Sequence, residues 1–315
     1  MGPFFRKSVD QHQYFGSLSL VDSQRLHFKE NQISGLIEIQ AAPERMEVLV
    51  FGDGEETGTY RLLPESRSKV VPADIGRDWD RPAVPIRAVA LPDQASRALW
   101  QALEYQHFTH QDIQGLADWE KFLQASLSEK LTCMVGIASE GCDGFIFLNE
   151  GSPIPNESIF CSSEGFFNNL ETAREFLQMP QQLTLYKADP TTQAYQCTFL
   201  RLGVGRWGKQ ILLNYKDFVG QKLLQILNSS LNAILVHQQA NIHLADVEII
   251  DNHFFVESRL AAGAYLALFQ GMSQLIGKVV GGLVTRRILS NTFEQLRGSE
   301  RDLLTTHTLT PASLM

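Results

Sequence analysis

Two stretches of this chain of 315 residues repeat one another. Residues 33–54 read ISGLIEIQAAPERMEVLVFGDG, and residues 131–151 read LTCMVGIASEGCDGFIFLNEG. Ile33 aligns with Leu131 at an offset of 98, and after a one-residue gap the offset becomes 97. A period of about 100 residues exceeds the roughly 20–50 of solenoid units, so it indicates two copies of a small domain. Because the shared positions are apolar or turn residues, the repeat predicts a shared scaffold rather than a shared catalytic site.

Each copy is predicted to be an α+β unit in which helices flank antiparallel strands. Residues 118–130 carry apolar side chains at helical spacing, and a fainter version of this helix opens the first copy. Closing helices are predicted at residues 93–106 and at about residues 167–178. Aliphatic and β-branched runs predict the hairpin strands, which are residues 36–39 and 47–51 in the first copy and 134–137 and 145–148 in the second.

The segments around these hairpins are less regular. Turns at residues 52–54 and 149–151 close the hairpins, because Gly and Asn tolerate a positive φ. Further strands of the second copy are predicted at residues 183–186 and 196–202. Residues 64–92 carry five prolines, which predicts a long irregular arm rather than a strand or helix. Arms of this length are often binding surfaces or disordered segments.

The order of helix, strand, hairpin ending in a DG turn, strand and helix resembles a known signalling module. The matching segments are residues 32–39 (QISGLIEI) with 51–54 (FGDG), and residues 130–137 (KLTCMVGI) with 147–151 (FLNEG). They resemble the PATAN-type domain, the N-terminal module of PatA-like cyanobacterial response regulators, which also occurs alone or in tandem in other bacterial signalling proteins. In the second copy, Cys133 stands where the family has glycine. The resemblance covers at most about half of the chain and implies signalling through protein–protein contacts, with no catalytic residues.

The charge of the chain limits its partners and its cysteines indicate its compartment. The formal net charge of −8 comes from the first 210 residues, which hold 19 Lys/Arg and 27 Asp/Glu. An acidic surface repels phosphate backbones, so no nucleic-acid partner is expected. No CxxC spacing or apolar signal stretch is present, which favours free thiols and a cytoplasmic protein. The four cysteines are Cys133, Cys142, Cys161 and Cys197.

The last third of the chain is predicted to be mostly helical. A helix is expected at residues 217–236, a hairpin at residues 247–256 with its turn at 251–252, and a long apolar helix at about residues 258–297. Glycines inside the long helix are sites where it would bend or break. Its apolar stripe has the spacing of an interhelical seam and predicts a homodimer. The stripe includes Tyr265, Met272, Leu275, Val279 and Leu283.

Residues 261–284 are apolar enough to raise the question of a membrane span, and residues 277–281 have the form GxxxG. Lys278 lies inside this stretch, and a lysine near the centre of a bilayer is unfavourable by about 3 kcal/mol. A closely packed or dimerising helix without a membrane span is therefore expected.

A glycine-rich segment, residues 203–209 (GVGRWGK), contains GxGxxG at Gly203, Gly205 and Gly208, followed by Lys209. This motif cradles phosphates when it links a strand to a helix within a βαβ unit, with an acidic residue about 20 positions on. Asn228 stands near that position, and no βαβ pattern surrounds the motif. A turn or bulge with its Trp207 packed against a neighbour is the favoured interpretation, with nucleotide binding as the alternative.

Catalytic and metal-binding patterns are weak throughout the sequence. His107 and His110 have i, i+3 spacing without a third ligand nearby, and His237 and His243 flank a predicted loop. No nucleophile elbow, zinc-protease motif or P-loop is present. The sequence therefore favours a non-enzymatic protein without a cofactor or metal.

These observations divide the chain into residues 1–110, 111–210 and 211–315, which are two α+β units and a mostly helical region. The favoured function is that of a cytoplasmic adaptor or signalling protein that contacts another protein and dimerises through its C-terminal helices. The alternative is a regulatory protein that binds a small molecule or nucleotide at residues 203–209 or in a pocket between the units. The expected contact residues at the hairpin tips are Asp53, Glu55, Glu56, Asn149 and Glu150.

Overall fold

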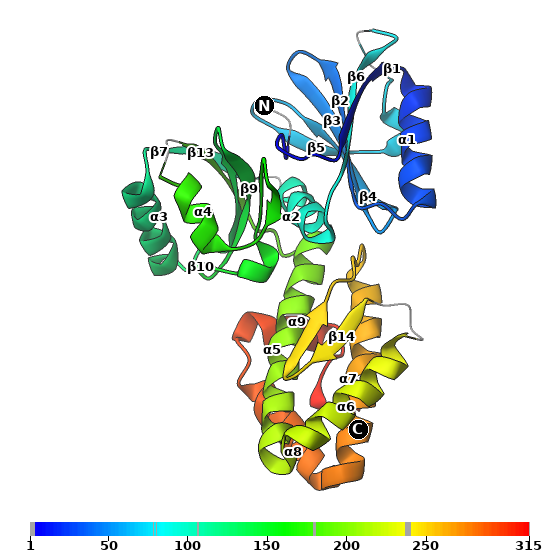
Figure 1. Ribbon diagram of the computed structural model, residues 1–315, viewed down its shortest axis with the longest axis vertical. Coiled ribbons are helices and arrows are strands. Elements are labelled where there is room, and N and C mark those ends of the chain that lie inside the picture. Colours follow the sequence, from blue (N-terminus) through cyan, green and yellow to red (C-terminus); the bar gives the residue numbers. More distant parts are fainter. Residues whose placement is uncertain are drawn as a thin grey trace. The chain divides into compact units, whose positions relative to one another are not determined.

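The computed structural model describes residues 4–77, 79, 81–105, 107–178, 181–236 and 241–314 (Figure 1). The chain divides into two compact units, residues 1–192 and residues 193–315. The first unit holds two antiparallel sheets with their helices, and the second holds helices and a short hairpin. The expected α+β class, with tandem hairpin units followed by a helical region, is confirmed.

The two sheets of the first unit have the same strand order. The first sheet runs β1-β6-β2-β3-β4-β5, and the second runs β7-β13-β8-β9-β11-β12. The first comprises β1 (Gln11–Gly16), β2 (Gly35–Ala42), β3 (Arg45–Gly52), β4 (Glu55–Leu62), β5 (Arg67–Val70) and β6 (Val84–Ala90). The second comprises β7 (Phe108–Ile113), β8 (Cys133–Ala138), β9 (Cys142–Asn149), β11 (Ile159–Ser162), β12 (Gly165–Phe167) and β13 (Gln181–Lys187), with β10 (Ser152–Pro153) paired to β9. The sequence repeat is therefore a repeat of topology.

The sequence predicted an irregular arm at the proline-rich residues 64–92, and this prediction is wrong. The described residues of this segment include β5, a 3-10 turn (Pro72–Asp74) and β6, which lies between β1 and β2 inside the sheet. The pairing of β6 with β2 ends at Ile86, opposite Ile39. Pro85 lies beyond the end of that ladder and stands opposite Phe15, next to the end of the pairing of β6 with β1.

Helices cover the outer face of each sheet (Figure 1). Helix α1 (Leu18–Glu30) places Val21 and Phe28 in a core with residues of β2, β3 and β6. Helices α3 (Leu116–Ser128) and α4 (Leu170–Phe176) cover the second sheet, where Trp119 and Phe122 share a core with β8, β9 and β13. A 3-10 turn (Pro155–Glu157) follows β10.

Helix α2 (Asp93–Glu104) lies between the inner faces of the two sheets. It contacts β2, β3 and β4 of the first sheet and β8, β9 and β11 of the second. Every residue from 95 to 103 is buried, including the polar Arg97 and Gln101. A helix that is buried all round is a core element. Helix α2 is therefore the layer that joins the two copies.

The hairpin turns repeat in their backbone conformation as well as in their sequence. The pairs with a left-handed φ are Gln32 and Lys130 (52° and 50°), Asp53 and Glu150 (50° and 52°), and Gly54 and Gly151 (80° each). Ser34 Oγ accepts the Asp53 N–H at 2.8 Å, and Thr132 Oγ1 accepts the Glu150 N–H at 3.1 Å. A side-chain hydroxyl at the equivalent position thus accepts a hydrogen bond from the equivalent turn in each copy.

The second unit begins with α5 (Gln193–Val219), which runs across the boundary expected at residues 210 and 211. The expected hairpin is displaced, because its turn lies at Asp246 (φ 50°) instead of residues 251–252. The expected long helix breaks at Gly281 (φ 83°). The remaining elements are α6 (Gln221–Val236), β14 (Ile242–Ala245), β15 (Glu248–Asp251), α7 (Ser258–Val280), α8 (Gly282–Glu294), α9 (Gly298–Thr306) and a 3-10 turn (Pro311–Leu314).

No helix in the described part of the chain combines the length and the apolar character that a membrane crossing requires.

Candidate functional site

A cavity of about 390 Å³ lies in the first unit, against the inner face of the second sheet. One wall is the N-terminal segment at residues 4–7, which we call the strap. The opposite wall is formed by inward-facing side chains of β7, β8, β9 and β13. The lining residues on which the argument depends are Phe4, Phe5, Arg6, Gly136, Asp143, Phe145, Thr184 and Tyr186.

The cavity exists where the two copies differ. In the first copy, Glu38 on β2 and Arg87 on β6 stand opposite each other and form a buried ion pair at 2.7 Å. The equivalent positions in the second copy, at offsets of 98 and 97, are Gly136 and Thr184, which also stand opposite each other. The second copy thus lacks both long charged side chains on its inner face.

Aromatic rings line the space that this difference leaves. The rings of Phe145 and Tyr186 lie over Gly136, where an added Cβ would come 3.1 Å from Tyr186 and 3.3 Å from Phe145. Phe4 stacks on Phe145 with ring centroids 6.3 Å apart, and Phe5 meets the same ring edge-on at 5.6 Å. A side chain at position 136 would therefore crowd the two rings that form the aromatic floor of the cavity.

The strap is held by charged groups from both sheets. The Phe4 N–H donates to Glu38 Oε1 at 2.8 Å, and the Arg87 guanidinium donates to the Phe4 carbonyl. The Arg6 N–H donates to Asp143 Oδ2 at 2.7 Å. Phe5 between them has a φ of 48°, a conformation that costs a bulky residue about 1 kcal/mol or more.

Asp143 is the most unusual group at this site. Only 6% of the residue is exposed. Its Oδ1 has no hydrogen-bond partner among the described residues. Burial raises the pKa of Asp143, although the Arg6 N–H and nearby cations act in the opposite direction. Burial also raises the pKa of Glu38, against the attraction of Arg87.

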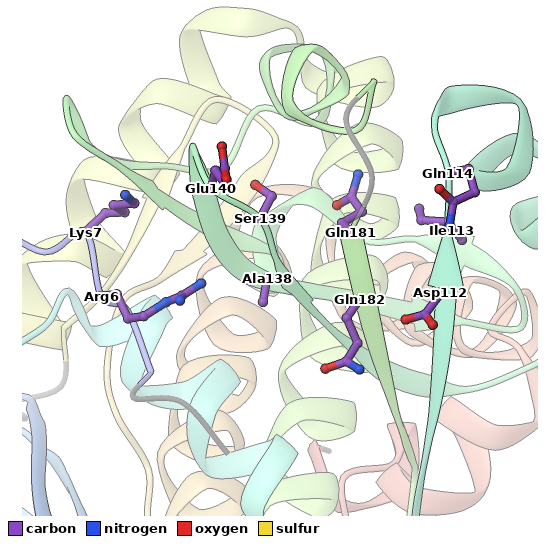
Figure 2. A pocket seen from close by; sticks show the side chains of 10 residues that line it. All are labelled: Arg6, Lys7, Asp112, Ile113, Gln114, Ala138, Ser139, Glu140, Gln181 and Gln182. Atoms are coloured by element: carbon purple, nitrogen blue, oxygen red, sulfur yellow. The ribbon is translucent and has the colours of Figure 1, made fainter.

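A wider and more open cavity of about 720 Å³ adjoins the first. The two share Arg6, Ala138 and Gln182. Figure 2 shows its polar lining, with Gln182 on β13 beside Asp112 on β7, and Arg6 of the strap reaching toward them. The outer cavity therefore adds polar side chains beside the aromatic floor of the inner one.

The hairpin tips expected to contact partners have structural roles. Asn149 is 1% exposed and cannot serve as a surface contact. Asp53 and Glu150 are half-buried at the left-handed turn positions. Glu56 forms an ion pair with Arg25 at 2.7 Å, which leaves Glu55 as the exposed carboxylate of the first tip.

The apolar stripe of the predicted dimer is divided between core and surface. Tyr265 and Met272 are fully buried within the second unit, so they do not face a partner. Leu275 is half-buried. Val279 and Leu283 are 49% and 85% exposed, on either side of the break at Gly281. Only the end of the stripe therefore offers an apolar surface.

The glycine motif does not form the expected turn, and no strand is found at residues 196–202. All of residues 203–209 lie inside α5, far from the helix N-terminus that a phosphate cradle needs. An added Cβ on Gly208 would lie 2.1 Å from Ile249, and one on Gly203 would lie 3.3 Å from Leu304. Gly205 has no such close neighbour. Close packing against neighbouring side chains thus explains the glycines at positions 203 and 208.

The other residues of this segment also serve the fold. Trp207 is fully buried, with its ring centroid 4.4 Å from that of Phe269 and 5.0 Å from that of Phe293, as the expected packing requires. Lys209 forms an ion pair with Glu248 at 2.8 Å. The segment is thus part of a helical interface within the second unit.

The histidines and cysteines in the described part of the chain do not combine into a metal-binding group. Among the described residues, no cluster of His, Cys, Asp and Glu could hold a metal ion. His110 is exposed, with its Nδ1 3.0 Å from Thr184 Oγ1, and His237 lies outside the described residues. The four cysteines are free and buried, and burial raises the pKa of each thiol to about 12. Such thiols are poor nucleophiles at neutral pH.

Comparison with protein-family models, with curated proteins and with solved structures gives no match. The case for function therefore depends on the site itself. Neither Asp143 nor the strap was predicted from the sequence. The replacement of an inward-facing charge between the copies was the signal that could have located the cavity.

Proposed function

We propose that this chain is a regulatory protein that binds a small molecule in the cavity between the strap and the second sheet. The observation that carries the proposal is an aromatic cavity bordered by a buried carboxylate with one oxygen unsatisfied. Ligand sites are concave and mostly apolar, with a few polar groups that fix orientation. The resemblance to PATAN-type signalling modules supports a regulatory role for the paired units.

Binding at this site is tested by a thermal-shift screen of the full chain against metabolites that include nucleotides, amines and acids. A ligand bound to the folded state raises the melting temperature by mass action. Ala138→Trp fills the cavity from an exposed position on its wall and is expected to abolish the shift. Thr109→Trp, at an exposed position on β7 outside the cavity, is the matched control and should retain it.

The proposal predicts at least one ligand whose effect depends on the cavity. It is contradicted if the screen yields no stabilising compound, or if the compounds found stabilise Ala138→Trp as much as the wild type.

Self-association is a second candidate, because Val279 and Leu283 remain exposed at the end of α7 and the start of α8. Two copies could bury these side chains against each other, which would fit the adaptor role expected from the sequence. Light scattering after size-exclusion chromatography is expected to show a dimer for the wild type and a monomer for Leu283→Glu. A monomeric wild type at micromolar concentration would contradict this candidate.

A further inference from the structure

We propose that the cavity binds a protonated amine joined to a flat apolar body, with the ammonium donating to Asp143 Oδ1. The apolar body would lie against Phe4, Phe145 and Tyr186. The inference rests on the proposed function and specifies the chemical class of its ligand.

The first copy of the repeat shows what the second copy lacks. Its buried carboxylate, Glu38, has an internal cation in Arg87, whose Nε and Nη2 both lie 2.7 Å from Glu38 Oε2. The position equivalent to Arg87 in the second copy is Thr184, which carries no charge. Asp143 is nevertheless buried on the inner face of that copy. A bound cation would supply from outside the partner that the first copy has in its own chain.

The hydrogen bonding of Asp143 indicates a donor as the missing partner. An ionised carboxylate oxygen is only an acceptor, so the unsatisfied Oδ1 is matched by an N–H group. Leaving a charged group unsatisfied when buried is unfavourable, and a charge-assisted hydrogen bond recovers that loss. Phe145 adds attraction, because aromatic faces favour cations. Tyr186 contributes apolar contact instead, since the Arg67 guanidinium already lies over its ring, 4.4 Å from the centroid.

The other charges near the cavity permit a cation. Arg87 is neutralised by Glu38, and the side chain of Arg6 is exposed to solvent, where its field is screened. Lys7 and Asp112 lie on the outer opening, together with Glu140. The inner cavity itself contains Asp143 as its only carboxylate among the described lining residues.

Entry of the ligand requires the strap to shift. Oδ1 is enclosed within the protein, and the strap lies against the same carboxylate through the Arg6 N–H. The left-handed φ of Phe5 shows that the strap is held in a strained conformation. A displacement of residues 4–7 away from Asp143 would expose the oxygen to the ammonium group.

The test is calorimetric titration of the full chain with 2-phenylethylamine, its N-acetyl derivative and 3-phenylpropionate. The amine is expected to bind at least about tenfold more tightly than either analogue, because only the amine carries a cationic donor. Asp143→Asn is expected to weaken amine binding at least tenfold. Glu44→Gln, at an exposed carboxylate that lines neither cavity, should leave it unchanged.

A second variant tests the same idea by a different route. Thr184→Arg restores the cation of the first copy and is expected to abolish amine binding in a folded protein. Equal binding of the amine and its acetylated form, or full binding by both Asp143→Asn and Thr184→Arg, would overturn the inference.

The two proposals fail in distinguishable ways. If the amine does not bind, but a compound from the wider screen loses its effect in Ala138→Trp and keeps it in Asp143→Asn, the site stands and the ligand class is wrong. If no compound depends on Ala138, both proposals are wrong.

Discussion

At the residue scale, buried carboxylates of the first unit have opposite electrostatic situations. Burial raises the pKa of Asp143, whose cationic neighbours do not compensate. Burial would also raise the pKa of Glu47, but hydrogen bonds from Arg45, Trp79 and Arg61 outweigh it and lower the pKa. The charged form is thus unfavourable at Asp143 and favourable at Glu47.

Asp143→Asn is therefore expected to stabilise the folded protein at pH 7, because the amide carries no charge that burial must desolvate. A raised folded-state pKa means that the wild type gains stability as the pH falls and Asp143 is protonated. The advantage of Asp143→Asn should accordingly shrink between pH 7 and pH 4. Urea unfolding at both pH values measures it, with Asp112→Asn as the control. A loss of stability at pH 7 would contradict this, because the bond from the Arg6 N–H would then outweigh the cost of burying the charge.

Glu47→Gln is expected to act in the opposite direction. Glu47 is fully buried, with Arg45 at 2.8 Å, Arg61 at 3.0 Å and Trp79 at 3.2 Å, so loss of its charge should cost about 3 kcal/mol at neutral pH. Because its folded-state pKa is lowered, the contribution is present above the unfolded value of about 4.5 and is lost as the pH falls below it. Urea unfolding measures the free energy of unfolding of Glu47→Gln and of a control, Glu44→Gln, at an exposed position. Similar losses in both variants would exclude this network as a source of stability.

At the element scale, the glycines of the two hairpins are equivalent in φ but not in surroundings. An added Cβ at Gly151 would lie 2.3 Å from Leu127 Cα, whereas one at Gly54 would lie 3.0 Å from its nearest neighbours. Gly151→Ala is expected to destabilise by about 2 kcal/mol or more, and Gly54→Ala by less, since both share the cost of the left-handed φ. Chemical denaturation of the two variants gives the comparison. Equal losses of stability in the two variants would mean that the left-handed φ, and not the neighbouring atoms, determines the cost.

The elements predicted correctly from sequence are those with local signals. The hairpins at Gly54 and Gly151 followed from strand composition and turn chemistry. Helix α5 was missed because its glycines suggested a turn, although Gly208 is needed for the approach of Ile249. Strand β6 was missed because its prolines suggested irregular chain. In both cases tertiary packing overrode a local preference.

At the scale of the whole molecule, helix α2 serves both copies of the repeat. Leu99 is fully buried in this helix, and its replacement by Ala is expected to cost about 3 kcal/mol. Because α2 contacts both sheets, hydrogen exchange should accelerate in β3 and β9 together. Exchange that accelerates in one of these strands alone would show that the copies are independent.

The candidate site could be predicted only in part. The change from Glu38 to Gly136 is visible in the aligned repeats, and it marks the difference that opens the cavity. The strap could not be placed, because the contact of Arg6 with Asp143 joins residues 137 positions apart without any sequence pattern. The first unit is thus a duplicated scaffold in which the inner face of one copy is altered.

The most direct test of this claim is a crystal structure of the full chain grown with 2-phenylethylamine. The account predicts ligand density in the second copy, with the amine nitrogen within hydrogen-bond distance of Asp143 Oδ1 and the ring beside Phe145. It predicts none beside Glu38, whose partner Arg87 is already present. Density beside Glu38, or an empty cavity at saturating ligand, would contradict it.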